Sequence, residues 1–516
     1  MRYQKARQIA GYGDKDLMGN LFHELERVAS ARRGAVAFDC MDGRALTFTE
    51  LLANAAVYSA ALTSLGVRAG DRVTVQLEKS IAGVWLYLAV LRCGAIYMPL
   101  NSGYTDAEIE YFVTDAEPTL IVLEPSRRAA VAALAEKAGV AARVATLGDL
   151  EERSRSVAPV PSVSRADGDV AAILYTSGTT GRSKGAMISH RNLVSNAKTL
   201  VEIWGFTPDD VLVHALPIYH VHGLFVALHC ALLSGATTRF LQRFEIGSVL
   251  DALVGASVFM GVPTYYTRLL GAAEFPRAGV SLRLWISGSA PLLPETFVAF
   301  ERRTGSAILE RYGMTEAGMI TSNPLRGSRL AGTVGTPLPG VSARVRRDDG
   351  SLAPSGEPGV LEISGPSVFG GYWRNEEKTR GSFTADGYFS TGDVVTLSDA
   401  GVVSIVGRQN DLIISGGLNV YPKEIEEHID ALAGVTESAV IGVPHPDFGE
   451  GVVAVIDRQL QTLCEADVLR PLRERLAAFK VPKRVIFVDS LPRNAMGKVQ
   501  KKLLRETYRE LFEAPP

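Results

Sequence analysis

Two hydrophobic periods alternate along most of this chain. Alanine- and leucine-rich stretches with apolar residues three and four positions apart predict helices over residues 51–65 and 81–92. Short runs of aliphatic and β-branched residues predict buried strands over residues 71–77, 95–100 and 120–123. Strands that alternate with helices indicate βαβ units, and therefore a mainly parallel sheet covered by helices.

The same rhythm continues further along the chain. We predict strands over residues 171–175, 211–216, 257–261 and 282–287, and each ends close to a glycine, a proline or a polar loop. In open α/β sheets, ligands bind beyond the carboxyl ends of the strands. We therefore expect functional residues to lie directly after these strands.

Beyond Val341 the pattern changes to short β-like runs, such as residues 359–363, and glycine turns. The predicted fold class is α/β, with a large N-terminal domain (residues 1–409) of βαβ-built sheets, helices and a small β-rich subdomain. A small, mobile α+β C-terminal domain (residues 410–516) follows. Its predicted elements are helices over 423–429 and 465–477 and strands over 438–443, 452–456 and 484–488.

Composition narrows the class of protein. A chain of 516 residues suggests about two to four domains. Its net charge of −2 does not favour a nucleic acid or an anionic membrane as a partner. The four cysteines form no C-x-x-C pair, which disfavours disulfides or a zinc ribbon and fits a reducing cytoplasm. The N-terminus lacks the apolar segment of a secretory signal, and the apolar runs 81–91 and 223–236 are too short to span a bilayer, so we expect core helices there.

A glycine- and hydroxyl-rich stretch follows the strand predicted at 171–175. Residues 174–185 read L-Y-T-S-G-T-T-G-R-S-K-G, with three glycines, five Ser or Thr residues and one lysine. Glycines allow backbone N–H groups to turn toward a ligand, and the hydroxyls and the lysine add donors, so the stretch predicts a phosphate cradle. It is no P-loop, because Ser183 precedes Lys184 and Gly185 follows it. The predicted phosphate-binding residues are Thr176, Ser177, Gly178, Thr179, Thr180, Gly181 and Lys184.

A second motif, E-R-Y-G-M-T-E, covers residues 310–316. Mg²⁺ prefers one or two carboxylates together with phosphate oxygens, so Glu316, with Thr176, is the predicted metal ligand. Thr315 is placed to donate to the α-phosphate, and Tyr312 to stack on adenine. The remaining nucleotide-binding predictions here are Glu310, Arg311 and Gly313.

Two further motifs lie nearer the C-terminus. The first is S-T-G-D over residues 390–393, followed by Gly407-Arg408; here Asp393 and Arg408 are candidates for binding the ribose hydroxyls. The second is P-R-N-A-M-G-K over residues 492–498, which ends at Lys498. A lysine near a C-terminus is usually a solvated charge, so any role of Lys498 rests on the flanking pattern.

In this order, the four motifs resemble the signature of the adenylate-forming enzymes, which include the acyl-CoA synthetases. The resemblance implies ATP, Mg²⁺ and coenzyme A as ligands and two half-reactions, with Lys498, Glu316 and Thr315 as catalytic residues. It also implies a C-terminal domain that swings about a hinge, at Asn410 here, where relatives commonly have Asp or Lys. Gly416 and Gly417 would then line the passage for coenzyme A. Ser289, Ala290 and Pro291 complete the predicted nucleotide site.

The identity of the acid substrate is predicted from the segments that should line the acyl pocket. These segments are polar. The segments H-V-H-G-L (220–224), G-V-P-T-Y-Y-T-R (261–268) and S-G-S-A-P-L (287–292) are similar to those of malonyl-CoA synthetases. The resemblance implies that Arg268 pairs with a second carboxylate, assisted by His222, because guanidinium binds carboxylate bidentately. Met319 would set the room for a 2-methyl group, as in methylmalonate, and Gly288 would line the pocket. His220 would gate the thioester channel.

Other functions share some of these motifs. An AMP-forming ligase for another short acid, or a stand-alone adenylation enzyme that loads a carrier protein, would share every ATP-binding residue named above. A catalytically inactive nucleotide-binding protein is disfavoured because Glu316 and Lys498 are both present. The polar pocket disfavours a luciferase-like oxygenase. A zinc site is disfavoured because the histidines at 214, 220, 222 and 229 match no common zinc spacing.

Overall fold

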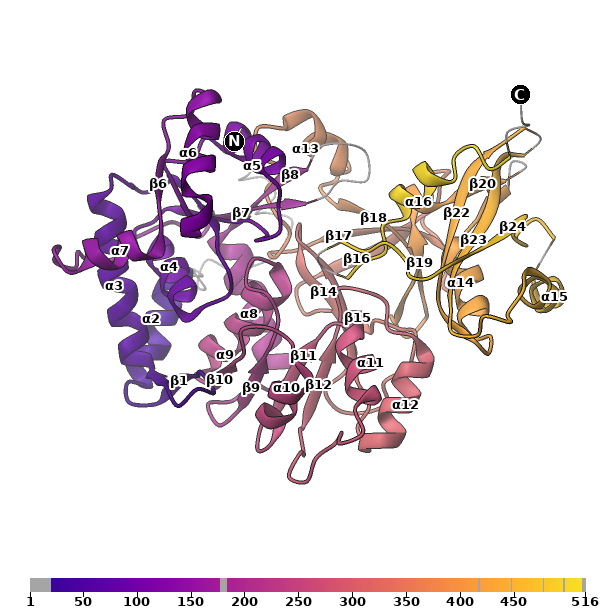
Figure 1. Ribbon diagram of the computed structural model, residues 1–516, viewed down its shortest axis with the longest axis horizontal. Coiled ribbons are helices and arrows are strands. Elements are labelled where there is room, and N and C mark those ends of the chain that lie inside the picture. The colour runs from indigo at the N-terminus through magenta and orange to yellow at the C-terminus, as the bar shows by residue number, and fades with distance from the viewer. Residues whose placement is uncertain are drawn as a thin grey trace. The chain divides into compact units, whose positions relative to one another are not determined.

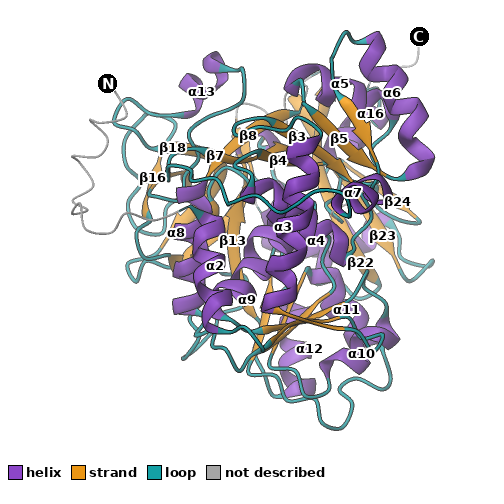
Figure 2. Ribbon diagram, turned by 90° about the vertical axis from the view of Figure 1, so that its left-hand side faces the viewer, coloured by secondary structure: helices purple, strands orange, loops and turns teal. Residues whose placement is uncertain are grey.

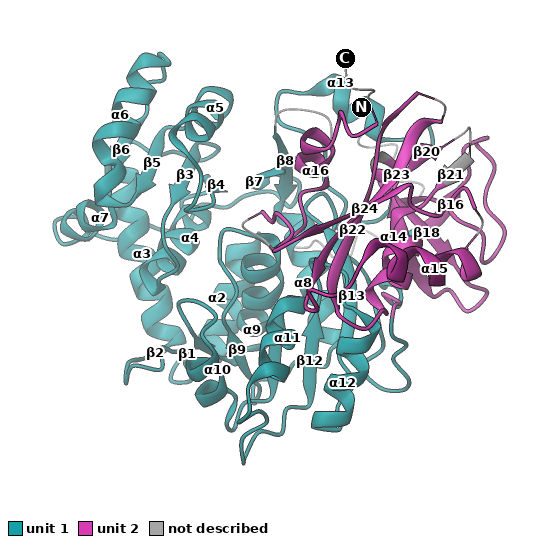
Figure 3. Cartoon of the chain, turned by 45° about the vertical axis from the view of Figure 1, so that its right-hand side comes forward, with its two compact units in different colours: residues 1–331, 335–342, 363–389 teal, residues 332–334, 343–362, 390–516 magenta. Residues whose placement is uncertain are grey.

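The structure is a computed structural model that describes residues 20–176, 183–415, 418–446, 448–476, 478–494 and 497–512. Two units are distinguished (Figure 3): unit 1 comprises residues 1–331, 335–342 and 363–389, and unit 2 comprises residues 332–334, 343–362 and 390–516. The domain boundary expected at Asn410 stays a prediction.

A six-stranded sheet of unit 1 carries the two strands that flank the predicted phosphate loop. Its order is β6-β5-β3-β4-β7-β8, and all neighbours are parallel except the antiparallel pair β7–β8. The strands are β3 (Arg72–Gln76), β4 (Ile96–Pro99), β5 (Leu120–Leu123), β6 (Arg143–Ala145), β7 (Val170–Thr176) and β8 (Lys184–Ser189). The predicted strands in this region are confirmed, and β4 and β5 are buried along their whole length, as expected for strands covered on both faces.

A nine-stranded sheet forms the rest of the framework of unit 1, in the order β15-β14-β13-β12-β11-β9-β10-β1-β2. Its central strands are parallel, so their carboxyl ends share one edge. The strands are β1 (Val36–Asp39), β2 (Ala45–Thr47), β9 (Val211–His214), β10 (Thr237–Phe240), β11 (Val258–Gly261), β12 (Leu284–Ser287), β13 (Leu309–Met314), β14 (Gly318–Ser322) and β15 (Thr336–Pro337).

The helices of unit 1 cover these sheets. In Figure 1, α4 and α8 lie between the strands β6–β8 and the strands β1, β9 and β10. Nearly all residues of α4 are buried, which accounts for its hydrophobic character on every face. The α-helices are α2 (Leu21–Ala31), α3 (Phe48–Ser64), α4 (Ile81–Arg92), α5 (Asp106–Ala116), α6 (Arg128–Lys137), α7 (Leu147–Ser154), α8 (His190–Ile203), α9 (His229–Ser234), α10 (Ile246–Leu253), α11 (Pro263–Gly271), α12 (Pro294–Thr304) and α13 (Glu376–Ser382), and η1 (Pro125–Arg127) is a short 3₁₀ turn.

One helical segment has an unusual geometry. The apolar run expected to form a single core helix over 223–236 is divided into η2 (His222–Leu228), which is a π-helix, and α9. π-helical turns are uncommon and occur frequently at functional sites. The segment is buried as predicted, but its hydrogen-bond pattern was not visible in the hydrophobic periodicity.

The described part of unit 2 is built mainly from two sheets and three helices. Figure 2 colours the strands orange and the helices purple. The four-stranded sheet has the order β16-β17-β18-β19, and the five-stranded sheet has the order β21-β20-β23-β22 with β24 paired to β23. The elements are β16 (Ser342–Arg346), β17 (Gly359–Ser364), β18 (Phe389–Leu397), β19 (Val403–Arg408), η3 (Gln409–Asp411), β20 (Ile413–Ser415), β21 (Leu418–Val420), α14 (Pro422–Asp430), β22 (Val435–His445), β23 (Gly449–Arg458), α15 (Glu465–Arg475), β24 (Arg484–Val488) and α16 (Lys501–Thr507). The predicted α+β character of this region is confirmed.

Within the described part of the chain, no helix combines the length and the apolar content that crossing a bilayer requires.

Candidate functional site

The predicted phosphate loop lies at the tip of the β7–β8 hairpin. Thr176 and Lys184 are direct partners across this antiparallel pair, so the hairpin holds both ends of the loop together. Ser177, Gly178, Thr179, Thr180 and Gly181 lie outside the described residues. The two described loop ends therefore place one hydroxyl and one ammonium at the carboxyl end of β7.

Glu316 lies beside these loop ends. It occupies the turn between β13 and β14 and is only 6% exposed. Its Oε1 atom accepts a hydrogen bond from the Tyr372 hydroxyl at 3.0 Å and lies 3.5 Å from the Thr176 hydroxyl. Burial, together with the Glu316 charge, raises the pKa of Tyr372, so its hydroxyl remains a donor. The structure thus brings together the two predicted metal ligands, Thr176 and Glu316.

A second cation accompanies Lys184 at this place. Burial lowers the pKa of Lys184, the charge of Lys378 on α13 lowers it further, and Glu316 opposes the shift. Two ammonium groups close together are suited to a polyanion such as a triphosphate. Sequence analysis missed both Lys378 and Tyr372, because neither stands in a spacing that distinguishes it from ordinary surface or core residues.

The oxygen donors at this site fit Mg²⁺. Thr176 offers a hydroxyl and Glu316 a carboxylate, and Mg²⁺ usually binds few protein ligands together with substrate phosphate oxygens. The described residues contain no group of three or more His, Cys, Asp or Glu residues arranged to hold a metal ion.

A second part of the site lies where the end of β12 runs beside the first residues of β13. The two strands are parallel, with Ser287 opposite Glu310, so the residues that follow β12 adjoin the motif carried by β13. Tyr312 and Glu310 are 9% and 7% exposed. The nucleotide-binding residues predicted in these two segments, Ser289, Ala290, Pro291, Glu310, Arg311, Tyr312 and Gly313, are thus brought to one edge of the sheet, and their individual roles stay predictions.

Arg311 is the most unusual residue at this edge. It is 3% exposed, and its Nε and Nη2 atoms are buried without a hydrogen-bond partner. Its guanidinium lies against Gly288, where an added Cβ would come within 2.3 Å of Nη1. Burial lowers the pKa of Arg311 to about 10, so it stays charged at neutral pH. A buried cation with unused donors is costly unless an anion completes it.

His222 adjoins this guanidinium. It is the first residue of η2, and its Nδ1 atom lies 3.1 Å from the Ser289 hydroxyl. Burial and then the charge of Arg311 hold the pKa of His222 well below its usual range, so the ring is neutral. Its Nε2 atom and the Ser287 hydroxyl are also buried without a hydrogen-bond partner. We call Arg311, His222, Ser287, Gly288 and Ser289 the anion cluster.

Arg268 is not brought into the anion cluster by any described contact. It lies in the last turn of α11 and is exposed, with its guanidinium 6.0 Å from the Phe244 ring centroid. The resemblance implied that Arg268 pairs with a second carboxylate, whereas the buried guanidinium with unused donors belongs to Arg311. Sequence spacing could not separate these two arginines, because burial depends on how the helix and the strand pack.

Met319 closes another wall of this region. It is 2% exposed, and a Cβ on Gly313 would come within 2.5 Å of its Cε atom. The Asn196 side chain from α8 binds both sides of the Met319 peptide, accepting from its N–H at 3.0 Å and donating to its carbonyl at 2.9 Å. The methionine is thus fixed at the predicted acyl pocket, and its role in setting room for a methyl group stays a prediction.

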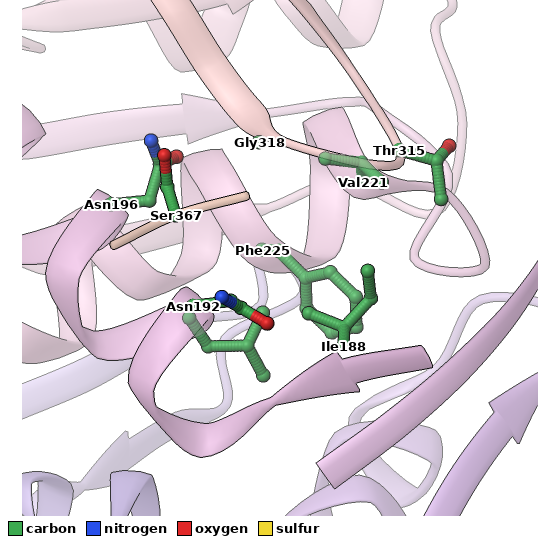
Figure 4. A pocket seen from close by; sticks show the side chains of 9 residues that line it. Ile188, Asn192, Asn196, Val221, Phe225, Thr315, Gly318 and Ser367 are labelled. Atoms are coloured by element: carbon green, nitrogen blue, oxygen red, sulfur yellow. The ribbon is translucent and has the colours of Figure 1, made fainter. Parts of the chain in front are cut away.

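A small cavity lies beside Gly318. Figure 4 shows it between Asn192 and Asn196 of α8, Phe225 of η2, and Thr315 near the end of β13. Its volume of about 20 Å³ is enough for about one water molecule. The cavity is too small for an organic acid.

In unit 2, Asp393 and Arg408 form a pair. They are direct partners across β18 and β19, and Arg408 Nε donates to the Asp393 carboxylate at 3.0 Å. The carboxylate is 3% exposed, whereas about half of the Arg408 side chain is accessible. The structure therefore brings the two predicted ribose-binding residues together, although they are fifteen positions apart.

The Lys498 side chain is exposed. Its N–H donates to the Asn494 side chain at 3.0 Å, and its carbonyl accepts from the Asn494 N–H at 2.9 Å. Gly416 and Gly417 lie outside the described residues, as does the side chain of Asn410. His220 is partly buried just before η2. The catalytic, channel, hinge and gate assignments of these residues stay predictions.

Comparison with known proteins gives consistent matches. The profile of the AMP-binding enzymes matches residues 25–373, and that of the AMP-binding enzyme C-terminal domain matches residues 424–498. The mitochondrial malonate–CoA ligase ACSF3 of Mus musculus is 36% identical over 86% of this chain and 83% of its own length. A malonate–CoA ligase of Arabidopsis thaliana is 34% identical over 85% of this chain and 78% of its own length. The crystal structure of ATP-bound MatB from Rhodopseudomonas palustris is 50% identical, covers 96% of this chain and 100% of its own, and superposes with a TM-score of 0.93.

Proposed function

Because the chain belongs to the family of AMP-binding enzymes, we propose that it is an acid–thiol ligase that joins malonate to coenzyme A through an enzyme-bound malonyl-adenylate. The identity of more than 30% to two malonate–CoA ligases over most of the chain supports this proposal. Methylmalonate is the second acid to test, because Met319 is the residue predicted to set the room for a 2-methyl group.

The reaction has two half-reactions. In the first, one malonate carboxylate oxygen attacks the α-phosphorus of ATP, the bond to the bridging oxygen breaks, and pyrophosphate leaves. In the second, the thiol of coenzyme A attacks the acyl carbon, loses its proton, and AMP leaves with the electrons of the mixed anhydride bond. Products are malonyl-CoA, AMP and pyrophosphate.

Unit 1 supplies groups suited to the first half-reaction. The positive charges of Lys184 and Lys378 favour binding of the triphosphate. Thr176 and Glu316 would hold Mg²⁺. The metal, when bound, neutralises phosphate charge. Tyr372 orients the Glu316 carboxylate through its hydrogen bond to Oε1. We assign to Lys498 the ammonium that stabilises the adenylation transition state, on the strength of its motif.

The observation that carries the choice of a dicarboxylate is the unpaired guanidinium of Arg311. A monocarboxylate uses its only charged group at the α-phosphate, whereas malonate has a second carboxylate left to pair with this cation. Pairing would satisfy donors that otherwise remain unused in a buried place. We therefore assign the distal carboxylate to Arg311 and His222, with Arg268 as the competing residue.

The first experiment measures AMP formation by the wild-type enzyme with ATP, Mg²⁺ and coenzyme A. The acids are acetate, propionate, malonate, methylmalonate, succinate and octanoate, and mass spectrometry identifies the thioester. Preference for malonate supports the proposal. Preference for a monocarboxylate would leave the ATP site intact and overturn the anion cluster as a carboxylate site. Adenylate formation without consumption of coenzyme A would indicate a stand-alone adenylation enzyme that loads a carrier protein.

The arginine assignment has its own test. We expect Arg311→Gln to raise the KM for malonate by on the order of 100-fold, because removing one partner of a buried charge pair costs about 2–5 kcal/mol. Arg268→Gln, at an exposed position, is the matched control and should change this KM less than about threefold. The reverse pattern would return the distal carboxylate to Arg268.

The remaining assignments follow from the same proposal. The ligands are small molecules, namely malonate, ATP and coenzyme A, with no nucleic acid and no membrane as a partner. The spacing of the four cysteines favours a reducing compartment, and we place the enzyme in the cytoplasm.

A further inference from the structure

A buried lysine outside the predicted motifs joins the two large sheets of unit 1. Lys79 follows β3 of the six-stranded sheet and is 7% exposed. Its Nζ atom lies 2.7 Å from His214 Nδ1, 2.8 Å from the His214 carbonyl and 2.5 Å from the Leu241 carbonyl. His214 ends β9 and Leu241 directly follows β10 of the nine-stranded sheet. The Nζ group thus has three acceptors at the carboxyl ends of two neighbouring strands.

The next link in this chain of hydrogen bonds is the His214 ring, which is fully buried. Its Nε2 atom lies 2.9 Å from the Gly223 carbonyl. A carbonyl only accepts, so Nε2 carries the proton and donates, and Nδ1 accepts from Lys79. Lys79 therefore selects the tautomer of His214 that binds Gly223.

Gly223 lies at the start of η2, directly after His222 of the anion cluster. A Cβ on Gly223 would come within 2.0 Å of the Pro217 carbonyl oxygen, so the segment between β9 and η2 closes tightly on itself. The Leu224 N–H donates to the His220 carbonyl at 2.9 Å and completes the turn. A hydrogen bond to the Gly223 carbonyl consequently fixes the backbone from which His222 projects.

We propose that Lys79 and His214 are positioning residues for acid binding, which hold the start of η2 so that His222 stays beside Arg311 and Ser289. This inference rests on the proposed function, because it assigns the anion cluster to the acid. Neither residue is expected to contact the acid. Their effect should therefore appear in the binding of the acid and not in the binding of ATP.

Two substitutions of His214 separate its two hydrogen bonds. The His214→Asn amide reaches the position of Nδ1, so it can accept from Lys79 but cannot reach the Gly223 carbonyl. The His214→Gln amide reaches the position of Nε2 and can donate to Gly223. We expect His214→Asn and Lys79→Met to raise the KM for the acid by about tenfold, with the KM for ATP changed less than twofold. His214→Gln should restore most of the wild-type KM for the acid.

Tyr87→Phe is the matched control for general destabilisation. It removes a buried hydrogen bond of 2.8 Å between Tyr87 and His229, which joins α4 to α9. It should lower the melting temperature by as much as His214→Asn does and leave the KM for the acid unchanged. A KM for the acid that follows the melting temperature across all four variants would overturn the proposal, as would equal KM values for His214→Asn and His214→Gln.

The experiment uses the acid that the wild-type enzyme converts best. If that acid is not a dicarboxylate, the proposed function has failed in the wild type, whereas the ratio of KM values still judges the positioning role. A readout independent of turnover is the ring ¹⁵N chemical shifts of His214 in the full-length protein. Lys79→Met should remove the fixed Nε2–H tautomer, and an unchanged tautomer would overturn the role of Lys79.

Discussion

At the scale of single residues, buried polar atoms separate structural side chains from those that await a ligand. Lys79 has three acceptors for its ammonium, whereas two nitrogen atoms of Arg311 have none. Both side chains are buried, yet only Arg311 has donors left to offer. Unused hydrogen-bonding capacity, more than burial or charge, therefore marks the place where a substrate anion completes the structure.

Tyr372 allows a test of the metal site at this scale. We expect Tyr372→Phe to slow malonate-dependent exchange of pyrophosphate into ATP by about tenfold at low Mg²⁺, because a hydrogen bond to a carboxylate contributes about 1.5–3 kcal/mol. Raising the Mg²⁺ concentration should recover part of the rate, since the carboxylate is retained but no longer oriented. The assay follows exchange against Mg²⁺ concentration.

Tyr388→Phe is the control for this substitution. It removes a 2.8 Å hydrogen bond to the Ser342 hydroxyl that involves no residue of the candidate site. If both phenylalanine variants show the same Mg²⁺ dependence, Tyr372 does not orient Glu316.

At the scale of elements, hydrophobic periodicity predicted much of the fold. The helix expected over 51–65 is α3 (Phe48–Ser64), and the strand expected over 120–123 is β5. These elements follow from local patterns that their packing reinforces. The phosphate-side residues Thr176 and Glu316 were also predicted together, because their motifs supply a hydroxyl and a carboxylate, which are groups that Mg²⁺ and phosphate require.

Other features could not be predicted, because they arise from contacts between distant segments. The π-helix η2 receives a hydrogen bond from His214 at its Gly223 carbonyl, whereas the apolar run itself is compatible with an α-helix. The burial of Arg311 and the exposure of Arg268 are set by how β13 and α11 pack. The spacing of residues in the sequence does not show which of the two arginine side chains is buried.

The first turn of α8 gives a prediction about pH. His190 is 1% exposed, its Nδ1 atom accepts from the Leu21 N–H at 3.3 Å, and burial lowers its pKa to about 4. Between pH 6.5 and about 4 the unfolded chain binds a proton that the folded chain does not, so the free energy of unfolding falls as the pH falls through this window. The full loss is on the order of 3 kcal/mol, at about 1.4 kcal/mol for each pKa unit.

Urea titrations at several pH values measure this effect. His190→Asn keeps an acceptor for the Leu21 N–H but cannot take up the proton, so its stability should depend less steeply on pH between 6.5 and 4. His428→Asn, at a partly exposed position of α14, should keep the wild-type slope. Equal slopes for His190→Asn and the wild type would show that His190 does not carry this loss.

At the scale of the whole molecule, chemistry is divided between two compact units. Unit 1 contains the phosphate-side residues and the anion cluster, and unit 2 contains the Asp393–Arg408 pair and Lys498. Lys498 is exposed, and its N–H donates to the Asn494 side chain at 3.0 Å.

Lys498→Ala tests this division of labour, because the two half-reactions can be measured separately. Adenylation, followed as pyrophosphate release in the absence of coenzyme A, should fall by about 100- to 1,000-fold when a preorganised transition-state charge is removed. Conversion of synthetic malonyl-adenylate to malonyl-CoA should stay within about threefold of wild type, since that step does not pass through a pentavalent phosphorus. Lys502→Ala, at an exposed lysine four positions further on that pairs weakly with Glu506, should leave both rates unchanged. Equal losses in both half-reactions would mean that Lys498 supports the fold of unit 2 or the thioester step as well, and an unchanged adenylation rate would remove it from the mechanism.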